Sequence, residues 1–387
     1  MNSESNSHSK ATDLKELAMV FFRLGAIAFG GPAAHIAMMD EEIVQKRKWI
    51  TRERLLDLLG VTNLIPGPNS TELAINIGFD RGGWKGLIVA GSAFIFPAMV
   101  IVWILAYIYV QYQALPQAQW LLYGIKPVIV AIILQALWKL GKKAVKDNVT
   151  KVTGILAVVA FFFNINEILI LLIVGLGVMV YKERHRFNFR NAWVAPMTIS
   201  PFLAQTNVSE SVTSPSGWGV FLFFLKVGFF LYGSGYVLLA FLQNQLVEQN
   251  QWLTSEQLID AIAIGQFTPG PILTTATFIG YLLAGNMGAV AATVGIFLPS
   301  FLVVLIINPW VDKLRNSPLT ASLLDGVNVA SLGLMAGVTY ILGTEAIVDG
   351  ITVTMAITAT FLVFRYKFNS LWLILAGALI GLVVNLL

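Results

Sequence analysis

Long apolar blocks separated by short polar stretches dominate the chain. Several of these blocks reach or approach the roughly 20 residues that an α-helix needs to cross about 30 Å of hydrocarbon. The clearest blocks are 84–110, 120–140, 220–242, 286–307 and 323–342. This pattern predicts an all-α, polytopic membrane protein.

The composition agrees with a membrane protein. Of the 387 residues, 57% are hydrophobic and 12% are charged, whereas about a quarter of a typical soluble domain is charged. The chain contains no cysteine, which excludes disulfides and thiolate metal sites. The first apolar segment contains Arg23 and precedes no small-residue cleavage site, so we expect an uncleaved membrane segment rather than a signal peptide.

The two halves of the chain repeat one pattern at an offset of about 203 residues. Nine identities fall among the 23 positions from 49 to 71 when these are compared with 252–274. The match continues at an offset of 202, where Pro97 corresponds to Pro299. We therefore expect four parts: a polar tail at 1–16, a first transporter repeat at 17–187, a linker at 188–217 and a second repeat at 218–387.

The basic residues change sides between the two halves. The loop at 40–54 carries five Lys and Arg residues, whereas its counterpart at 242–253 carries none. The loop at 111–118 carries none, whereas its counterpart contains Lys313 and Arg315. Because short loops rich in Lys and Arg stay cytoplasmic, the reversal predicts two halves of opposite orientation, as in many secondary transporters.

Each half is expected to contain five crossings and one re-entrant hairpin. The segment 55–80 begins and ends beside basic residues, so we expect it to enter and leave on one face. The tip of this hairpin is predicted at Pro66-Gly67-Pro68. The crossings of the first half are predicted near 17–39, 84–110, 119–140, 152–163 and 166–181.

A Pro-Gly-Pro motif lies inside an apolar segment of each half, at 66–68 and 269–271. Proline removes a donor and disfavours the helix before it, so each motif predicts a helix break followed by a new helix start. A helix start exposes backbone N–H groups and a partial positive charge, which together attract anions. We expect the two starts to hold a small anion between them near the bilayer midplane; the alternative is that each break is only a kink or a tight hairpin.

The expected substrate site combines these two motifs with the residues around them. It consists of Asn63, Pro66, Gly67, Pro68, Asn69, Ser70, Thr71, Gln266, Thr268, Pro269, Gly270, Pro271, Thr274 and Thr275.

Three basic residues inside apolar segments are candidates to neutralise the anion. Arg23 and Lys226 occupy matched positions of the two halves, and a cation inside a membrane is usually functional because its burial is costly. The alternative is that such a side chain snorkels toward the interface. Lys126 is the third candidate, and Asn328 occupies its matched position.

Three acidic residues are candidates for proton coupling. Asp57 and Asp260 match across the repeat, whereas Glu72 has no acidic counterpart. The sequence contains no glycine-rich phosphate loop and no His/Glu cluster with metal-ligand spacing. We therefore expect neither ATP hydrolysis nor a metal centre, and no enzymatic activity.

Other polar positions have structural interpretations. Glu53 and Glu256 are interpreted as helix-capping residues near the membrane interface. His35 could titrate near neutral pH, but its counterpart is Leu238, so it is interpreted as a packing or hydrogen-bonding residue. The glycine-rich stretches at 30–32 and 233–235 are expected to break the first crossing of each half.

As a set, these motifs resemble the chromate ion transporter family in its long, two-domain form. The resemblance rests on 22–32 (FRLGAIAFGGP), Trp49-Ile50-Thr51, Pro66-Gly67-Pro68 and 82–86 (GGWKG). The second half repeats the set, so the resemblance covers about 17 to 386. It implies a multi-pass protein of the bacterial inner membrane that exports chromate, driven by the proton motive force and without a cofactor.

The partners expected from this resemblance are chromate or a similar oxyanion and the lipid bilayer, but no nucleic acid; a homodimer is left open. The residues alone do not separate chromate from sulfate or molybdate, which share its charge and shape. A passive anion channel is a further alternative. A membrane enzyme acting on lipid-linked substrates would need clustered acid-base or metal residues, which the sequence does not contain.

Overall fold

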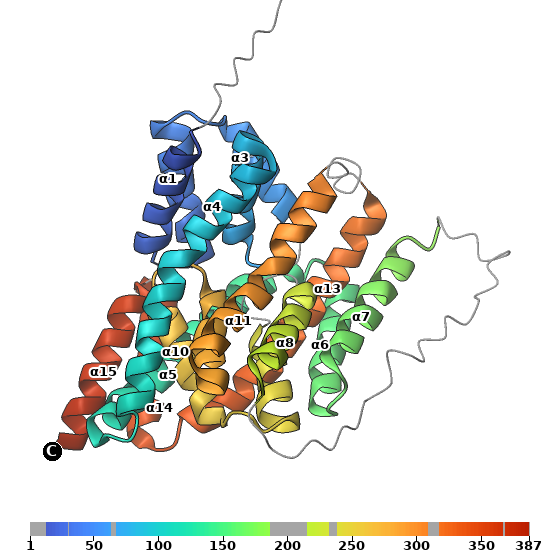
Figure 1. Cartoon of the computed structure of the whole chain (residues 1–387). Coiled ribbons are helices and arrows are strands. Elements are labelled where there is room, and N and C mark those ends of the chain that lie inside the picture. The colour runs from blue at the N-terminus through green and yellow to red at the C-terminus, as the bar shows by residue number, and fades with distance from the viewer. Residues whose placement is uncertain are drawn as a thin grey trace, which may run out of the picture.

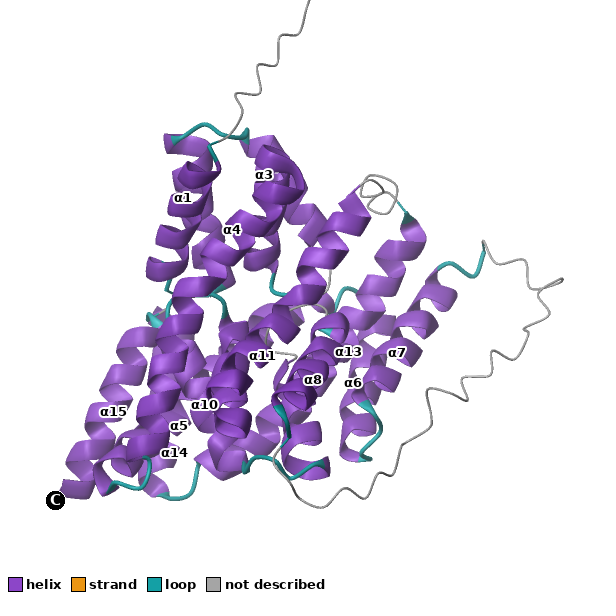
Figure 2. Cartoon of the chain, viewed as in Figure 1, coloured by secondary structure: helices purple, strands orange, loops and turns teal. Residues whose placement is uncertain are grey.

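The computed structural model describes residues 13–29, 31–62, 67–185, 215–231, 238–308, 317–366 and 368–386. Every regular element within these ranges is a helix (Figures 1 and 2). Several predicted features lie outside the described residues: most of the polar tail and of the linker, Asn63, Pro66 and the glycine-rich stretch 233–235.

The helices of the two halves follow one another in the same order. The first half contains α1 (Leu14–Ile27), α2 (Pro32–Met39), the π-helical turn η1 (Asp40–Lys46), α3 (Arg52–Thr62), α4 (Asn69–Tyr112), α5 (Pro116–Ala144), α6 (Asn148–Phe162) and α7 (Glu167–Lys182). The second half contains α8 (Gly217–Phe230), α9 (Leu238–Leu242), η3 (Gln243–Gln249), α10 (Ser255–Phe267), η4 (Ile272–Thr274), α11 (Thr275–Ile307), α13 (Pro318–Ala346), α14 (Gly350–Phe361), η6 (Leu362–Tyr366) and α15 (Ser370–Leu386).

Within the described ranges, four helical stretches are long and apolar enough to cross a membrane by length and composition. They are Asn69–Tyr112, Pro116–Ala144, Ile272–Ile307 and Pro318–Ala346. Shorter apolar helices, such as α6, α8 and α15, accompany them. The protein is therefore a multi-pass, all-helical membrane protein. The crossing expected at 17–39 is divided between α1 and α2, which leave a break around Gly31.

Both α4 and α11 consist of two helical pieces joined at a sharp turn. Gly83 and Gly285 have φ angles of 58° and 59°, which glycine adopts without a steric penalty. The turn brings Gly78 against the backbone of Gly86, although residues eight apart in a straight helix are about 12 Å apart. The first piece of α4 therefore folds back on the second, and the matched glycines of α11 do the same.

The start of α3 lies close to the end of the first helical piece of α4. Arg54, at the beginning of α3, donates from Nε to Oδ2 of Asp80 over 2.9 Å. Asp80 lies at the end of the first piece of α4. The beginning of α3 and the end of the first piece of α4 thus meet at an ion pair.

The two halves interleave rather than forming separate bundles. Helices α6 and α7 pack on α13 of the second half, while α14 and α15 pack on α5 of the first half. The backbones meet at glycines, with Gly124 of α5 against Gly377 of α15 and Gly326 of α13 against Gly175 of α7. Small residues allow such close helix crossings in membranes. α4 and α11 also contact each other directly.

Gly124→Ala tests this interleaving. The added Cβ would overlap the carbonyl oxygen of Gly377, and overpacking of this kind costs about 1–3 kcal/mol. We expect a lower Tm for the purified protein in detergent, followed by size-exclusion chromatography of heated samples. Gly177→Ala is the matched control because no heavy atom lies within 4 Å of a Cβ at that position; equal Tm values for the two variants would contradict the packing.

Candidate functional site

The two Pro-Gly-Pro turns each bind the broken first helix of the opposite half. The backbone N–H of Gly67 donates to the carbonyl of Leu231 over 2.6 Å, and the N–H of Gly270 donates to the carbonyl of Ala28 over 2.9 Å. The two donors are matched positions of the repeat, and so are the two acceptors. The hydrogen bonds therefore form a reciprocal pair that ties the centre of the molecule together.

Glycine is required at the middle of each turn. The φ angles of Gly67 and Gly270 are 134° and 89°, which side-chain-bearing residues rarely adopt. A Cβ at Gly67 would overlap the carboxyl of Glu72 and meet Oγ of Ser300 at 2.5 Å, while one at Gly270 would lie 2.6 Å from Cβ of Ala98. The first turn is thus packed tightly against α4 and α11, and the second against α4 and α1.

New helices start directly after both turns, as the sequence predicted. α4 begins at Asn69, η4 begins at Ile272 and α11 follows at Thr275. The first amides of a helix lack the acceptor that the helix itself would supply. Within these starts the N–H groups of Thr71 and Thr274 donate to the carbonyls of Pro68 and Pro271 over 2.9 and 3.0 Å, so anion binding at the starts stays a prediction. The glycine amides of the turns are already hydrogen-bonded to the opposite half.

His35 connects the break in the first helix to the helix start of α4. Its ring is buried, with Nε2 3.0 Å from the carbonyl of Ala28 and Nδ1 3.1 Å from Oγ of Ser70. Because a carbonyl can only accept, Nε2 carries the proton and Nδ1 accepts from the Ser70 hydroxyl. The hydrogen-bonding interpretation of His35 is confirmed. The carbonyl of Ala28 therefore accepts from both halves of the protein.

Several buried polar atoms near the turns have no hydrogen-bond partner among the described residues. They are Oγ1 of Thr71, both carboxyl oxygens of Glu72 and Nε2 of Gln266. A buried polar atom without a partner is costly, and native proteins retain few of them. Glu72 is fully buried, and its carboxyl lies beside Gly67. These atoms flank the turns at which the sequence placed the anion.

Arg23 and Lys226 both lie on the outside of the described helices. Arg23 lines a small pocket of about 190 Å³ that also contains Glu41 and Glu42. Lys226 lies close enough to the buried Glu167 for their charges to interact. Each predicted cation therefore faces carboxylates, and its contact with substrate stays a prediction.

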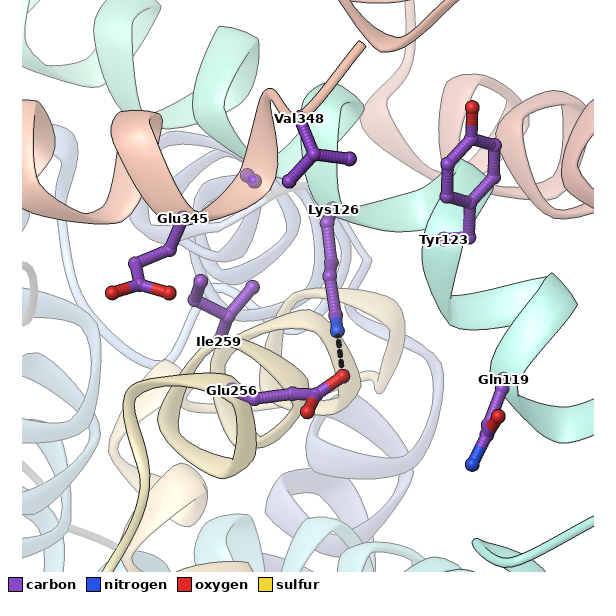
Figure 3. Close-up of a pocket in the computed structure, with 8 residues that line it drawn as sticks. Gln119, Tyr123, Lys126, Glu256, Ile259, Glu345 and Val348 are labelled. Atoms are coloured by element: carbon purple, nitrogen blue, oxygen red, sulfur yellow. Dashed lines mark hydrogen bonds and ion pairs between the residues drawn. The ribbon is translucent and has the colours of Figure 1, made fainter.

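Lys126 joins the two halves through an ion-pair cluster. Its Nζ lies 2.6 Å from Oε1 of Glu256 and 3.7 Å from Oδ1 of Asp260. The hydroxyl of Tyr109 donates to the other oxygen of Asp260 over 2.8 Å. Lys126 and Glu256 line a pocket of about 280 Å³ between α5, α10 and α13 (Figure 3). The structure thus brings together two predicted functional residues, Lys126 and Asp260.

The interpretation of Glu256 as a helix cap is wrong. Thr254 is the N-cap of α10, since its hydroxyl accepts from the N–H of Gln257 over 3.1 Å and the Gln257 side chain returns the bond. The pattern Thr-x-x-Gln is the signature of a capping box, so the sequence contained this signal. Glu256 is free to pair with Lys126 instead.

The edge of the same pocket is held by a loop that joins α13 to α14. Asp349 caps α14 through the backbone N–H of Thr352 and accepts from the hydroxyl of Tyr123 over 2.7 Å. The backbone N–H of Thr352 and this hydroxyl lower the pKa of Asp349. Asp349 therefore stays charged and holds the loop against α5.

Tyr109 and Ser300 belong to these clusters but were not among the predicted site residues. Tyr109 lies near the end of an apolar helix, and its partner Asp260 is 151 positions away, so no local pattern marks it. Ser300 directly follows Pro299, and Pro299 matches Pro97 of the first half, so its position could have been noticed from the repeat. Asp57 is partly buried at the position matched to Asp260, and its role in proton coupling stays a prediction.

The fold and these clusters define a helical membrane protein whose broken helices meet at its centre. The sequence profile of the family described as chromate transporter matches residues 15–181 and 218–382. The chain therefore belongs to the chromate transporter family.

Full-length relatives carry the same description. The chromate transport protein of Cupriavidus metallidurans is 33% identical and aligns with 96% of this chain and 93% of its own length. The probable chromate transport protein of Synechococcus elongatus is 32% identical, with 88% and 87% covered. The chromate transport protein of Pseudomonas aeruginosa is 29% identical, with 99% and 98% covered. No solved structure matches the chain.

His35→Leu tests the link between the first helix and α4, and it introduces the residue that the second half has at this position. The buried Ser70 hydroxyl would lose its partner, which costs about 1–3 kcal/mol. We expect a lower Tm and reduced transport. The exposed His185 supplies the control, since His185→Leu should change neither quantity; an unaltered Tm in His35→Leu would argue against the link.

Proposed function

We propose that the protein is a secondary transporter that exports chromate, or a closely similar tetrahedral oxyanion, across the bacterial inner membrane and is coupled to the proton motive force. The observation that carries this proposal is the reciprocal pairing of Gly67 with Leu231 and of Gly270 with Ala28 in a chain of the chromate transporter family. This pairing supports a central site between the two helix starts, whose amides would favour a dianion.

The architecture that we propose is a pair of inverted repeats, each with a re-entrant hairpin. Three observations support it: the reversal of loop charge between matched loops, the ion pair between Arg54 and Asp80 at the two ends of the 54–80 segment, and the exchange of terminal helices between the halves. Inverted repeats let a transporter open to either side of the membrane by rocking one half against the other.

In this mechanism the anion lies between the amides after Pro68 and Pro271. The unpartnered side chains of Thr71 and Gln266 offer further donors. Arg23 and Lys226 supply positive charge along the pathway. Proton binding at Asp57, Glu72 or Asp260 then couples anion movement to the proton gradient.

The direct test measures chromate flux in proteoliposomes with and without an imposed pH gradient. We expect flux only, or mainly, when the gradient is present, and reduced flux in the presence of sulfate if the two ions compete. Flux that ignores the gradient would indicate a passive channel. Absence of chromate flux together with gradient-driven sulfate flux would indicate a transporter of another oxyanion.

Arg23→Ala and Lys226→Ala test the predicted cations. Removing a hydrogen bond to a charged group costs about 1.5–3 kcal/mol, so we expect transport to fall about 10- to 100-fold in each variant at equal protein levels. Lys15→Ala, an exposed cation on the same helix as Arg23, is the control. Wild-type flux in both single variants would remove these cations from the mechanism.

A further inference from the structure

The cluster of Lys126, Glu256 and Asp260 has no equivalent at the matched positions of the repeat. Lys126 belongs to the first half, whereas Glu256 and Asp260 belong to α10 of the second half. At the matched positions the chain has Asn328, Glu53 and Asp57. The carboxylates are duplicated but the lysine is not, so an equivalent ion pair cannot form there.

The three charged groups of the cluster differ in their access to water. The side chains of Lys126, Asp260 and Glu256 are 13%, 2% and 70% exposed. An exposed carboxylate is screened by water and holds a cation weakly, whereas a buried carboxylate holds it strongly because the surroundings screen little. Glu256 is the nearer partner of Lys126, at 2.6 Å, but water screens it, whereas Asp260 acts on Lys126 from a buried position at 3.7 Å.

Few other titratable groups surround Asp260. Tyr109 of α4 donates to it. In their described residues, α11, α15 and η4, which also pack on α10, contain no Asp, Glu, Lys, Arg or His. The remaining titratable side chains that line the pocket are Glu345 of α13 and Tyr123 of α5. Of the other elements that pack on α10, η3 carries Glu248 and α11 carries Tyr281.

The pocket beside Lys126 has room for a small ion. Its volume is about 280 Å³, and a water molecule takes about 30 Å³ of liquid volume, so a tetrahedral oxyanion with part of its hydration shell fits. Figure 3 shows the Lys126 side chain reaching from α5 to Glu256, with Glu345 on the far side of the opening. Lys126 is the only cation that lines this pocket among the described residues.

We propose that Lys126 is an anion-binding residue that becomes available when Asp260 takes up a proton. This proposal deepens the proposed function and rests on it. With Asp260 charged, Lys126 is neutralised. A proton from water that enters through the pocket converts Asp260 to the neutral acid. The dianion then displaces the exposed carboxylate of Glu256 from Lys126 and binds to Lys126 in the pocket. When the anion leaves, Asp260 returns the proton to water and pairs with Lys126 again. One proton therefore accompanies each dianion, and the net negative charge that moves outward is driven by the membrane potential, the electrical part of the proton motive force.

The test measures chromate binding to the purified full-length protein by equilibrium dialysis, above neutral pH, where chromate is a dianion. Because one proton is bound with each anion, the affinity of the wild-type protein should fall with rising pH, by up to about tenfold per pH unit. Asp260→Asn fixes a neutral group beside Lys126, so its affinity should be high and independent of pH. Lys126→Gln should bind at least about tenfold more weakly.

Two further variants make the test selective. Lys146→Gln is the matched control, because Lys146 pairs with Asp325 of the other half over 2.6 Å and its loss changes the net charge equally; it should bind as the wild type does. Tyr109→Phe removes a hydrogen bond that favours the charged form of Asp260. Its binding should therefore persist to higher pH than that of the wild type, even if Asp260→Asn does not fold.

The outcomes separate this inference from the proposed function. If the wild-type protein does not bind chromate, the proposed function fails and the inference fails with it. If the wild-type protein binds chromate but Lys126→Gln binds equally well, the inference alone is overturned. The inference is likewise overturned if Asp260→Asn or Tyr109→Phe keeps the wild-type pH dependence.

Discussion

The structure depends on hydrogen bonds to the backbone N–H and C=O groups that are left without a partner where its helices are broken. Non-helical backbone at membrane depth survives only where protein or water meets its polar groups. Here each Pro-Gly-Pro turn supplies the donor for the broken first helix of the opposite half, through Gly67 and Leu231 and through Gly270 and Ala28. Each half therefore completes the centre of the other, and the terminal helices likewise cross over to pack on α5 and α13.

The repeat made much of this arrangement predictable. The helix starts after the two turns and the long apolar helices follow from local patterns of proline and hydrophobic residues, whereas the sharp bends at Gly83 and Gly285 were not predicted. The exchange of partners between the halves does not, because a single sequence contains no information on which of two equivalent helices a turn will meet. Contacts such as Tyr109 with Asp260 span 151 positions and leave no periodic signal.

The sequence predicted the candidate-site residues that follow the repeated Pro-Gly-Pro motifs, but it did not predict the contacts of residues that have no counterpart in the other half. Ser70 and Thr71 were identified from their place after the first turn, and the structure finds both buried beside it. His35 has no counterpart in the second half, and its bond to Ala28 became visible only in three dimensions. Lys126 was identified as an intramembrane cation, but its two carboxylate partners lie on a helix more than 100 residues away. The backbone of the two halves is therefore similar, and residues without a counterpart, such as His35 and Lys126, make the two halves chemically different.

The most direct test of this account is the structure of the purified protein in a lipid nanodisc by electron cryo-microscopy, with the main chain traced through both turns. We expect the amide of Gly67 to bond to Leu231 and that of Gly270 to bond to Ala28, with the two halves inserted in opposite orientations. A map in which each turn binds the first helix of its own half, or in which both halves run the same way through the bilayer, would contradict it.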